Sequence, residues 1–124
     1  GHYAKLGKDY SAIGDENRCI EYLQKAKKIY EKFFGVEHYL TLEIDSLLSE
    51  SLGLQGDAKG AQITLSKIIG AQVAQHGADH IVVARTRSKL CRVLVTLGAY
   101  REALKEHEKT ARVYSRFYGE GHIE

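Results

Sequence analysis

The sequence repeats itself every 42 residues, and this period constrains the fold more than any other feature. Gly35, Gly77 and Gly119 stand one period apart, and each is followed three residues later by a histidine. A second series of glycines, a column of leucines and a column of small residues keep the same step: Gly14, Gly56 and Gly98; Leu6, Leu48 and Leu90; Cys19, Ala61 and Ala103. Repeats of this length fold as stacked copies of one supersecondary unit.

Within each repeat, apolar residues recur at steps of three and four along two stretches. This spacing predicts two amphipathic helices per repeat. The first helices are expected over 39–55 and 81–97, and the second helices over about 17–34, 59–76 and 101–118. The chain has no proline, so glycine has to end these helices, because it accepts the positive φ found there. Short turns make neighbouring helices antiparallel, and the pairs must stack to bury their apolar stripes.

The middle repeat carries the pattern of the tetratricopeptide repeat. That pattern has a leucine and a small residue, a large residue three positions later, a turn glycine, and a small residue five positions on. Here these are Leu48-Ser49, Leu52, Gly56 and Ala61. The chain therefore resembles tetratricopeptide proteins, and its 42-residue period and Gly-x-acidic-His linkers are similar to the kinesin light chain subclass. Proline usually follows the linker histidine in that subclass, whereas this chain has Tyr39 and Ile81.

The resemblance implies an all-α fold of antiparallel helix pairs, wound into a right-handed superhelical solenoid of about three repeats and six helices. We expect a single domain over 1–124, with repeats near 1–38, 39–80 and 81–122, as a piece of a longer solenoid. In kinesin light chains an asparagine pair lines the concave groove. Ala4-Lys5, Ser46-Leu47 and Ser88-Lys89 stand in those places here.

The first helices of such repeats line the concave face, so their inward positions are the candidate binding residues. These are Lys5, Lys8, Glu43, Ser46, Glu50, Arg85, Ser88, Lys89 and Arg92. Three cations of the third repeat follow one another at steps of four and three, which places them on one helix face. We expect this groove to bind a peptide or helix of a protein partner, whose acidic residues contact the cations. The alternative is that these charges are solvated and pair between helices, Glu50 with Arg92 or Lys8.

No motif has the spacing of a catalytic site: a phosphate loop, a nucleophile elbow and a paired-carboxylate signature are all missing. His38, His80 and His122 come one per repeat, roughly 10 Å apart in stacked helices, too far for ligands about 2 Å from one zinc ion. His76 and His80 are four residues apart, but Gly77 between them ends the helix, so they need not share a face. The sequence therefore predicts a non-catalytic scaffold without a metal or a cofactor.

Composition narrows the class of partner. The 18 basic and 16 acidic residues leave a net charge of +2, too balanced to indicate nucleic-acid binding. No apolar run reaches the roughly 20 residues of a membrane span, so membrane insertion is not expected. Cys19 and Cys91 are expected to be buried small residues, and so few cysteines indicate a reduced, cytoplasmic setting.

Two features of single helices suggest further hypotheses. Gly53, Gly60 and Gly70 lie inside helices of the middle repeat, each costing roughly 1 kcal/mol relative to Ala. Either this repeat is the softest, or Gly53 and Gly60 permit close helix approach. The charged face of the last helix, Glu102, Lys105, Glu106 and Lys109, is expected to be solvated.

The last helix also carries apolar residues that no later helix covers: Val113, Tyr114, Phe117 and Tyr118. Either further repeats cover them, or a second copy does, forming a homodimer through this helix. Two alternatives to peptide binding follow: a segment that dimerises or spaces a larger protein, and the sensor repeats of a multidomain regulatory protein.

Overall fold

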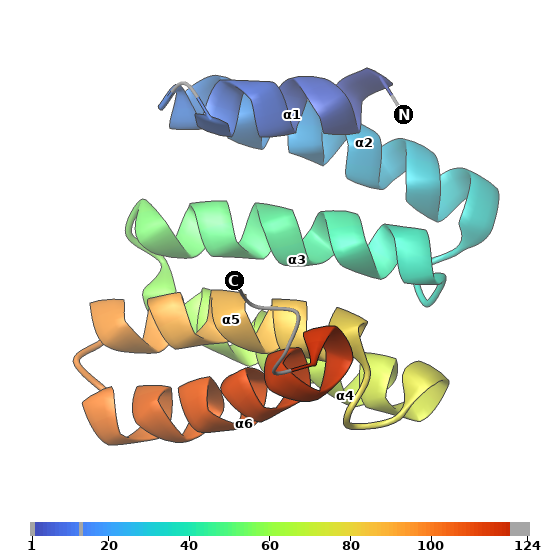
Figure 1. Cartoon of the computed structure of the whole chain (residues 1–124). Helices are drawn as coiled ribbons and strands as arrows, with labels where there is room; N and C mark the ends of the chain where they lie inside the picture. The colour runs from blue at the N-terminus through green and yellow to red at the C-terminus, as the bar shows by residue number, and fades with distance from the viewer. Residues whose placement is uncertain (1, 13, 120–124) are drawn as a thin grey trace.

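The computed structural model of the chain describes residues 2–12 and 14–119, and these form six α-helices and no strand. The helices are α1 (His2–Ala12), α2 (Glu16–Phe34), α3 (Tyr39–Leu54), α4 (Ala58–His76), α5 (Ile81–Thr96) and α6 (Tyr100–Tyr118). Each packs on the next, and α3 also packs on α5, so the helix pairs stack along one direction (Figure 1). The predicted all-α solenoid of three helix pairs is confirmed, with boundaries within two residues of those expected.

Glycine makes the sharp turns between the helices. Gly35, Gly77 and Gly119 follow α2, α4 and α6 with φ of 89°, 93° and 74°. Each also donates its N–H to the carbonyl four residues earlier, closing the last turn of its helix. Since L side chains rarely adopt this positive φ, the glycine column is a requirement of the backbone.

The linker histidines begin the first helices of the second and third repeats. The Nδ1 atoms of His38 and His80 accept hydrogen bonds from the backbone N–H of Leu40 and Val82, at 3.2 and 3.1 Å. These are N-caps, which satisfy a donor that the helix leaves open. The His80 ring also stacks on His76 with centroids 4.7 Å apart, although Gly77 separates the two residues. The two side chains therefore meet across the linker, although Gly77 ends the helix between them.

The core forms two clusters, one around each junction between repeats. The first includes Leu23 and Ile44, and the second includes Leu65 and Leu94, all of them buried. Cys19 is buried as expected, with its Sγ 3.6 Å from Ser51 Oγ, whereas Cys91 is only half-buried.

The interior glycines of the middle repeat have different causes. A Cβ on Gly53 would lie 2.6 Å from the Cβ of Ala61, so this glycine permits the close approach of α3 and α4. A Cβ on Gly60 would meet the carboxylate of Asp57, which caps α4. Glycine is therefore needed at position 60 to leave room for this capping carboxylate. Nothing lies within 4 Å of a Cβ on Gly70. The softness of the middle repeat stays a prediction.

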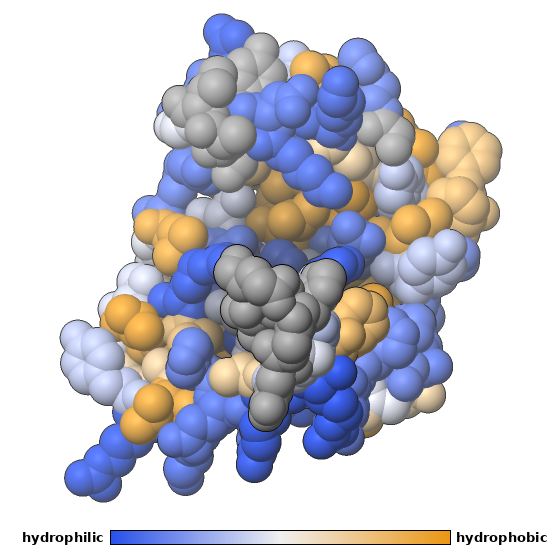
Figure 2. Space-filling model, in the orientation of Figure 1, coloured by the Kyte–Doolittle hydropathy of each residue, from blue (hydrophilic) through white to orange (hydrophobic). Residues whose placement is uncertain are grey.

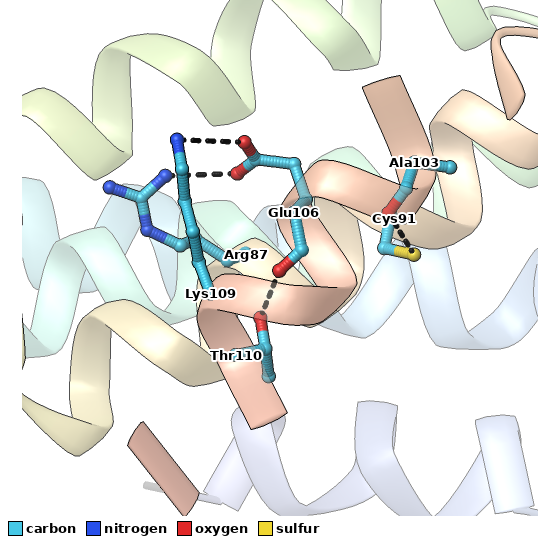
Figure 3. A network of polar contacts seen from close by, with 6 residues as sticks. All are labelled: Arg87, Cys91, Ala103, Glu106, Lys109 and Thr110. Carbon is cyan, nitrogen blue, oxygen red and sulfur yellow. Dashed lines mark hydrogen bonds and ion pairs between the residues drawn. The ribbon is translucent and has the colours of Figure 1, made fainter. Parts of the chain in front are cut away.

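Two expectations about α6 are wrong. Val113 is buried, because it points toward the helices packed beneath α6. Glu106 is not a solvated residue: its carboxylate lies 2.9 Å from Arg87 of α5 and 3.5 Å from Lys109, and its side chain is only 14% exposed (Figure 3). The charge pattern of one helix could not show that α5 presents an arginine to it.

Candidate peptide-binding groove

The first helix of each repeat contributes charged side chains to one surface. Lys8 Nζ of α1 lies 3.8 Å from Glu43 Oε1 of α3, and Arg92 of α5 pairs with Glu50 of α3. The pairing of Glu50 with Arg92, predicted as the alternative to a free groove, is confirmed, whereas Lys8 pairs with Glu43. Figure 2 shows apolar residues at the bottom of the hollow between α1 and the helices below it.

Two depressions lie along this surface. The first, ≈ 250 Å³, lies between α1 and α3 and is lined by Ala4, Lys5, Lys8, Tyr30, Leu40, Glu43 and Ile44. The second, ≈ 110 Å³, lies between α3 and α5 and is lined by Lys8, Glu43, Ser46, Leu47, Gln72, Val82, Arg85, Thr86 and Lys89. Six of its lining residues stand 42 positions after lining residues of the first depression. Ser46, for example, is the equivalent of Ala4, and Thr86 is the equivalent of Ile44. The repeat therefore produces two equivalent depressions with different side chains.

The charge of the second depression is positive. Arg85 and Lys89 have no ion-pair partner among the residues that the structure describes, whereas Glu43 and Glu50 are already paired. Burial lowers the pKa of the half-buried Lys89 ammonium from its usual value. The cations Arg92 and Arg85 lower this pKa further, and the two nearby carboxylates oppose them. An anion beside Lys89 would favour its charged form by direct attraction and so offset the cost of its burial.

One residue of this site was missed by the sequence analysis. Gln72 comes from the second helix α4, is almost fully buried, and lines the second depression. Its Oε1 has no hydrogen-bond partner within the described ranges. The equivalent positions of the other repeats hold Tyr30 and Tyr114. The sequence signal that could have found Gln72 was therefore an amide at a position where the other repeats have tyrosine.

Two predicted residues contribute less than expected. Ser46 is buried, and its hydroxyl donates to the carbonyl of Glu43 at 2.7 Å, so its hydrogen bond stays within α3. Ser88 is half-buried and borders neither depression. Of the other predicted residues, Lys5, Lys8, Glu43, Arg85 and Lys89 line the two depressions, and Glu50 and Arg92 pair with each other on the same surface without lining either one.

Residues 83–124 match the sequence model of a family described as Tetratricopeptide repeat. The matched stretch is one 42-residue period long. This stretch is similar to one tetratricopeptide repeat. The two preceding helix pairs share its columns of leucine, glycine and small residues, and the six helices are consistent with a tetratricopeptide-type helical solenoid. No curated protein matches the chain.

Two further properties concern what the described residues lack. No helix in residues 2–12 and 14–119 combines the length and the apolar content needed to cross a bilayer. In the same residues, no three histidine, cysteine or acidic side chains gather as they would around a metal ion.

Proposed function

We propose that this chain is a non-catalytic scaffold that binds a peptide or helix of a protein partner in the groove formed by α1, α3 and α5. Tetratricopeptide repeats generally mediate protein–protein interaction, which supports this class of function. The observation that carries the proposal is the pair Arg85 and Lys89, two cations without an ion-pair partner in the described chain, beside a depression. A ligand with acidic residues fits these charges.

The physical reason is the partial burial of this site. A carboxylate that reached both Arg85 and Lys89 would form charge-assisted hydrogen bonds, which are stronger than those between neutral groups. Leu47 and Val82 line the same depression and would contact the apolar part of the ligand side chain. The Oε1 atom of Gln72 would accept a hydrogen bond from a donor group of the ligand.

Charge reversal tests the groove. Peptides selected from a random display library on the wild-type protein are expected to be rich in Asp and Glu. Arg85→Glu combined with Lys89→Glu should weaken their binding by at least about tenfold, measured by fluorescence anisotropy. Arg101→Glu combined with Arg112→Glu makes the same charge change on the exposed side of α6, and it should leave the affinity within about twofold. Selected peptides without acidic residues, or equal losses in both double variants, would contradict the proposal.

The kinesin light chain-like subclass and a cytoplasmic location belong to the same proposal. The 42-residue period and the linker histidines that cap α3 and α5 support the subclass. Two free cysteines, neither in a disulfide, support a reducing compartment.

Self-association through α6 is a second candidate function. Tyr100 and Leu104 lie four residues apart on α6, so they share a face, and Leu104 is 57% exposed. On α4 the corresponding face is covered by α5, which buries Leu65 and Ile69. A second copy that covered the outer face of α6 would bury it in the same way.

A further inference from the structure

A separate groove lies on the side of α3 opposite the peptide-binding groove. Its wall is formed by Gln24, Lys27, Lys28 and Glu31 of α2, and its floor by Leu48 and Leu52 of α3. Its volume is ≈ 490 Å³, compared with ≈ 250 and ≈ 110 Å³ for the depressions of the first groove. Leu52 lies on the side of α3 that faces this groove, and Leu54 lies on the opposite side, because side chains two positions apart on a helix point about 200° apart. We call this surface the convex groove.

The third repeat offers a comparison for the convex groove within the same chain. One repeat further on, Leu90 and Leu94 form the floor of a corresponding space of ≈ 240 Å³ that is lined by residues of α4, α5 and α6. Leu94 is 2% exposed, whereas Leu52, at the same position of the repeat, is 37% exposed. The floor is therefore covered in the third repeat and open in the middle repeat.

The side chains of α6 explain this difference. Glu102, Lys105 and Glu106 line the space in the third repeat. Glu106 is held there by Arg87 and Lys109, as Figure 3 shows. Together these long side chains cover Leu94.

The middle repeat lacks the equivalent cover. In α4 the three corresponding positions are Gly60, Ile63 and Thr64, which cannot reach across the floor. Asp45 stands at the position of Arg87 and pairs with Lys27 of α2, 3.1 Å away. The middle repeat therefore has neither the long acidic side chain nor the arginine that would hold it.

The charges around the convex groove favour an acidic occupant. Lys28 lines the groove, and Lys67 occupies the position of Lys109, which lines the corresponding space in the third repeat. Both are exposed, and neither has an ion pair in the part of the chain that the structure describes. The charge of Lys27 is matched by Asp45, so the lining itself keeps Lys28 and Glu31, and Lys67 adds a positive charge outside the lining.

We propose that the convex groove binds an amphipathic helix of a protein partner, with its apolar stripe on Leu48 and Leu52 and its carboxylates toward Lys28 and Lys67. Helices bind such grooves through apolar residues three and four positions apart. Ile63 is exposed at the position of Lys105 and extends the apolar surface onto α4. The partner helix supplies the cover that α6 gives to Leu94. This site is independent of the peptide-binding groove.

Two synthetic peptides test the proposal. Both have 15 residues with leucines three and four positions apart, flanked by glutamates in one and by lysines in the other. The glutamate peptide should bind the wild-type protein at least about tenfold more tightly than the lysine peptide, measured by fluorescence anisotropy. It should shift the methyl NMR signals of Leu48, Leu52 and Ile63. No binding of the glutamate peptide up to about 1 mM, or shifts confined to other surfaces, would overturn the proposal.

Matched variants locate the binding. Leu52→Lys places a charge on the floor and should lower the affinity for the glutamate peptide by at least about tenfold. Leu54→Lys, the same change on the opposite face of α3, should change this affinity by less than about twofold. Equal losses would overturn the proposal. Lys28→Glu with Lys67→Glu alters exposed residues only, so it tests the site even if Leu52→Lys does not fold. It should reverse the preference between the two peptides, and an unchanged preference would also overturn the proposal.

Discussion

At position 53 the packing leaves room for a hydrogen atom and nothing larger. A Cβ on Gly53 would lie 2.6 Å from Ala61 Cβ of α4 and 3.3 Å from Val93 Cγ2 of α5. Three helices therefore meet at this residue. Glycine costs roughly 1 kcal/mol of helix stability relative to alanine, and the close contacts offset that cost.

Gly53→Ala should lower the free energy of unfolding by about 1–3 kcal/mol, because overpacking outweighs the better helix propensity of alanine. Gly70→Ala is the matched control: its Cβ would meet no atom within 4 Å, so this variant should gain up to about 1 kcal/mol. Urea unfolding at equal slope measures both changes. A Gly53→Ala protein as stable as the wild type would show that the helices can separate at little cost.

Four of the helices begin at side-chain caps of two kinds, whereas Ala99 at the start of α6 makes no side-chain cap hydrogen bond. α2 and α4 begin at Asp15 and Asp57, whose carboxylates accept backbone N–H groups three residues on. α3 and α5 begin at histidines, whose Nδ1 atoms accept a backbone N–H two residues on. The histidine of each of these two linkers therefore has a local structural role, because it caps the helix that follows it.

Removing one histidine cap measures its contribution. His80→Ala should lower the free energy of unfolding by about 1 kcal/mol, because the N–H of Val82 loses its acceptor. His80→Asp keeps a capping oxygen but loses the ring that stacks on His76, so it should retain most of the stability. Thermal unfolding followed by circular dichroism distinguishes the two. If both variants lose the same amount, the stacked ring and not the cap stabilises the linker.

The sequence was sufficient for the helices and for part of the groove. Apolar spacing and glycine positions are local signals, so α2 begins one residue from its predicted start at 17, and α3 ends one residue from 55. Arg85 and Lys89 line one depression, because one helix face carries both, whereas Arg92 of the same face lines neither depression. Gln72 and the contact of Arg87 with Glu106 depend on how neighbouring helices pack, which the pattern of one helix does not contain.

For the molecule as a whole, the outer face of α6 exposes Leu104, whereas the equivalent face of α4 is covered by α5. If a second copy covers it, the sedimentation coefficient of the wild-type protein should rise with concentration. Leu104→Glu should keep the protein monomeric, because a charge would be buried in the interface. Val95→Glu, which changes an exposed apolar residue of α5, should associate as the wild type does. A wild-type protein that stays monomeric at all concentrations would contradict self-association.

Because the two depressions are equivalent in backbone but not in side chains, each can prefer a different residue of the ligand. Stacked helices repeat at roughly 10 Å, about the length of one three-residue turn of a polyproline II helix. A ligand in that conformation would therefore place every third side chain in a successive depression. Position 43 is a glutamate and its equivalent, position 85, is an arginine, so neighbouring depressions already differ in charge on one backbone geometry. Arg85 lines only the second depression, whereas Glu43 lines both, so a mutation at position 85 can change which residue is accepted at one place in the ligand while the contacts in the first depression stay as they are.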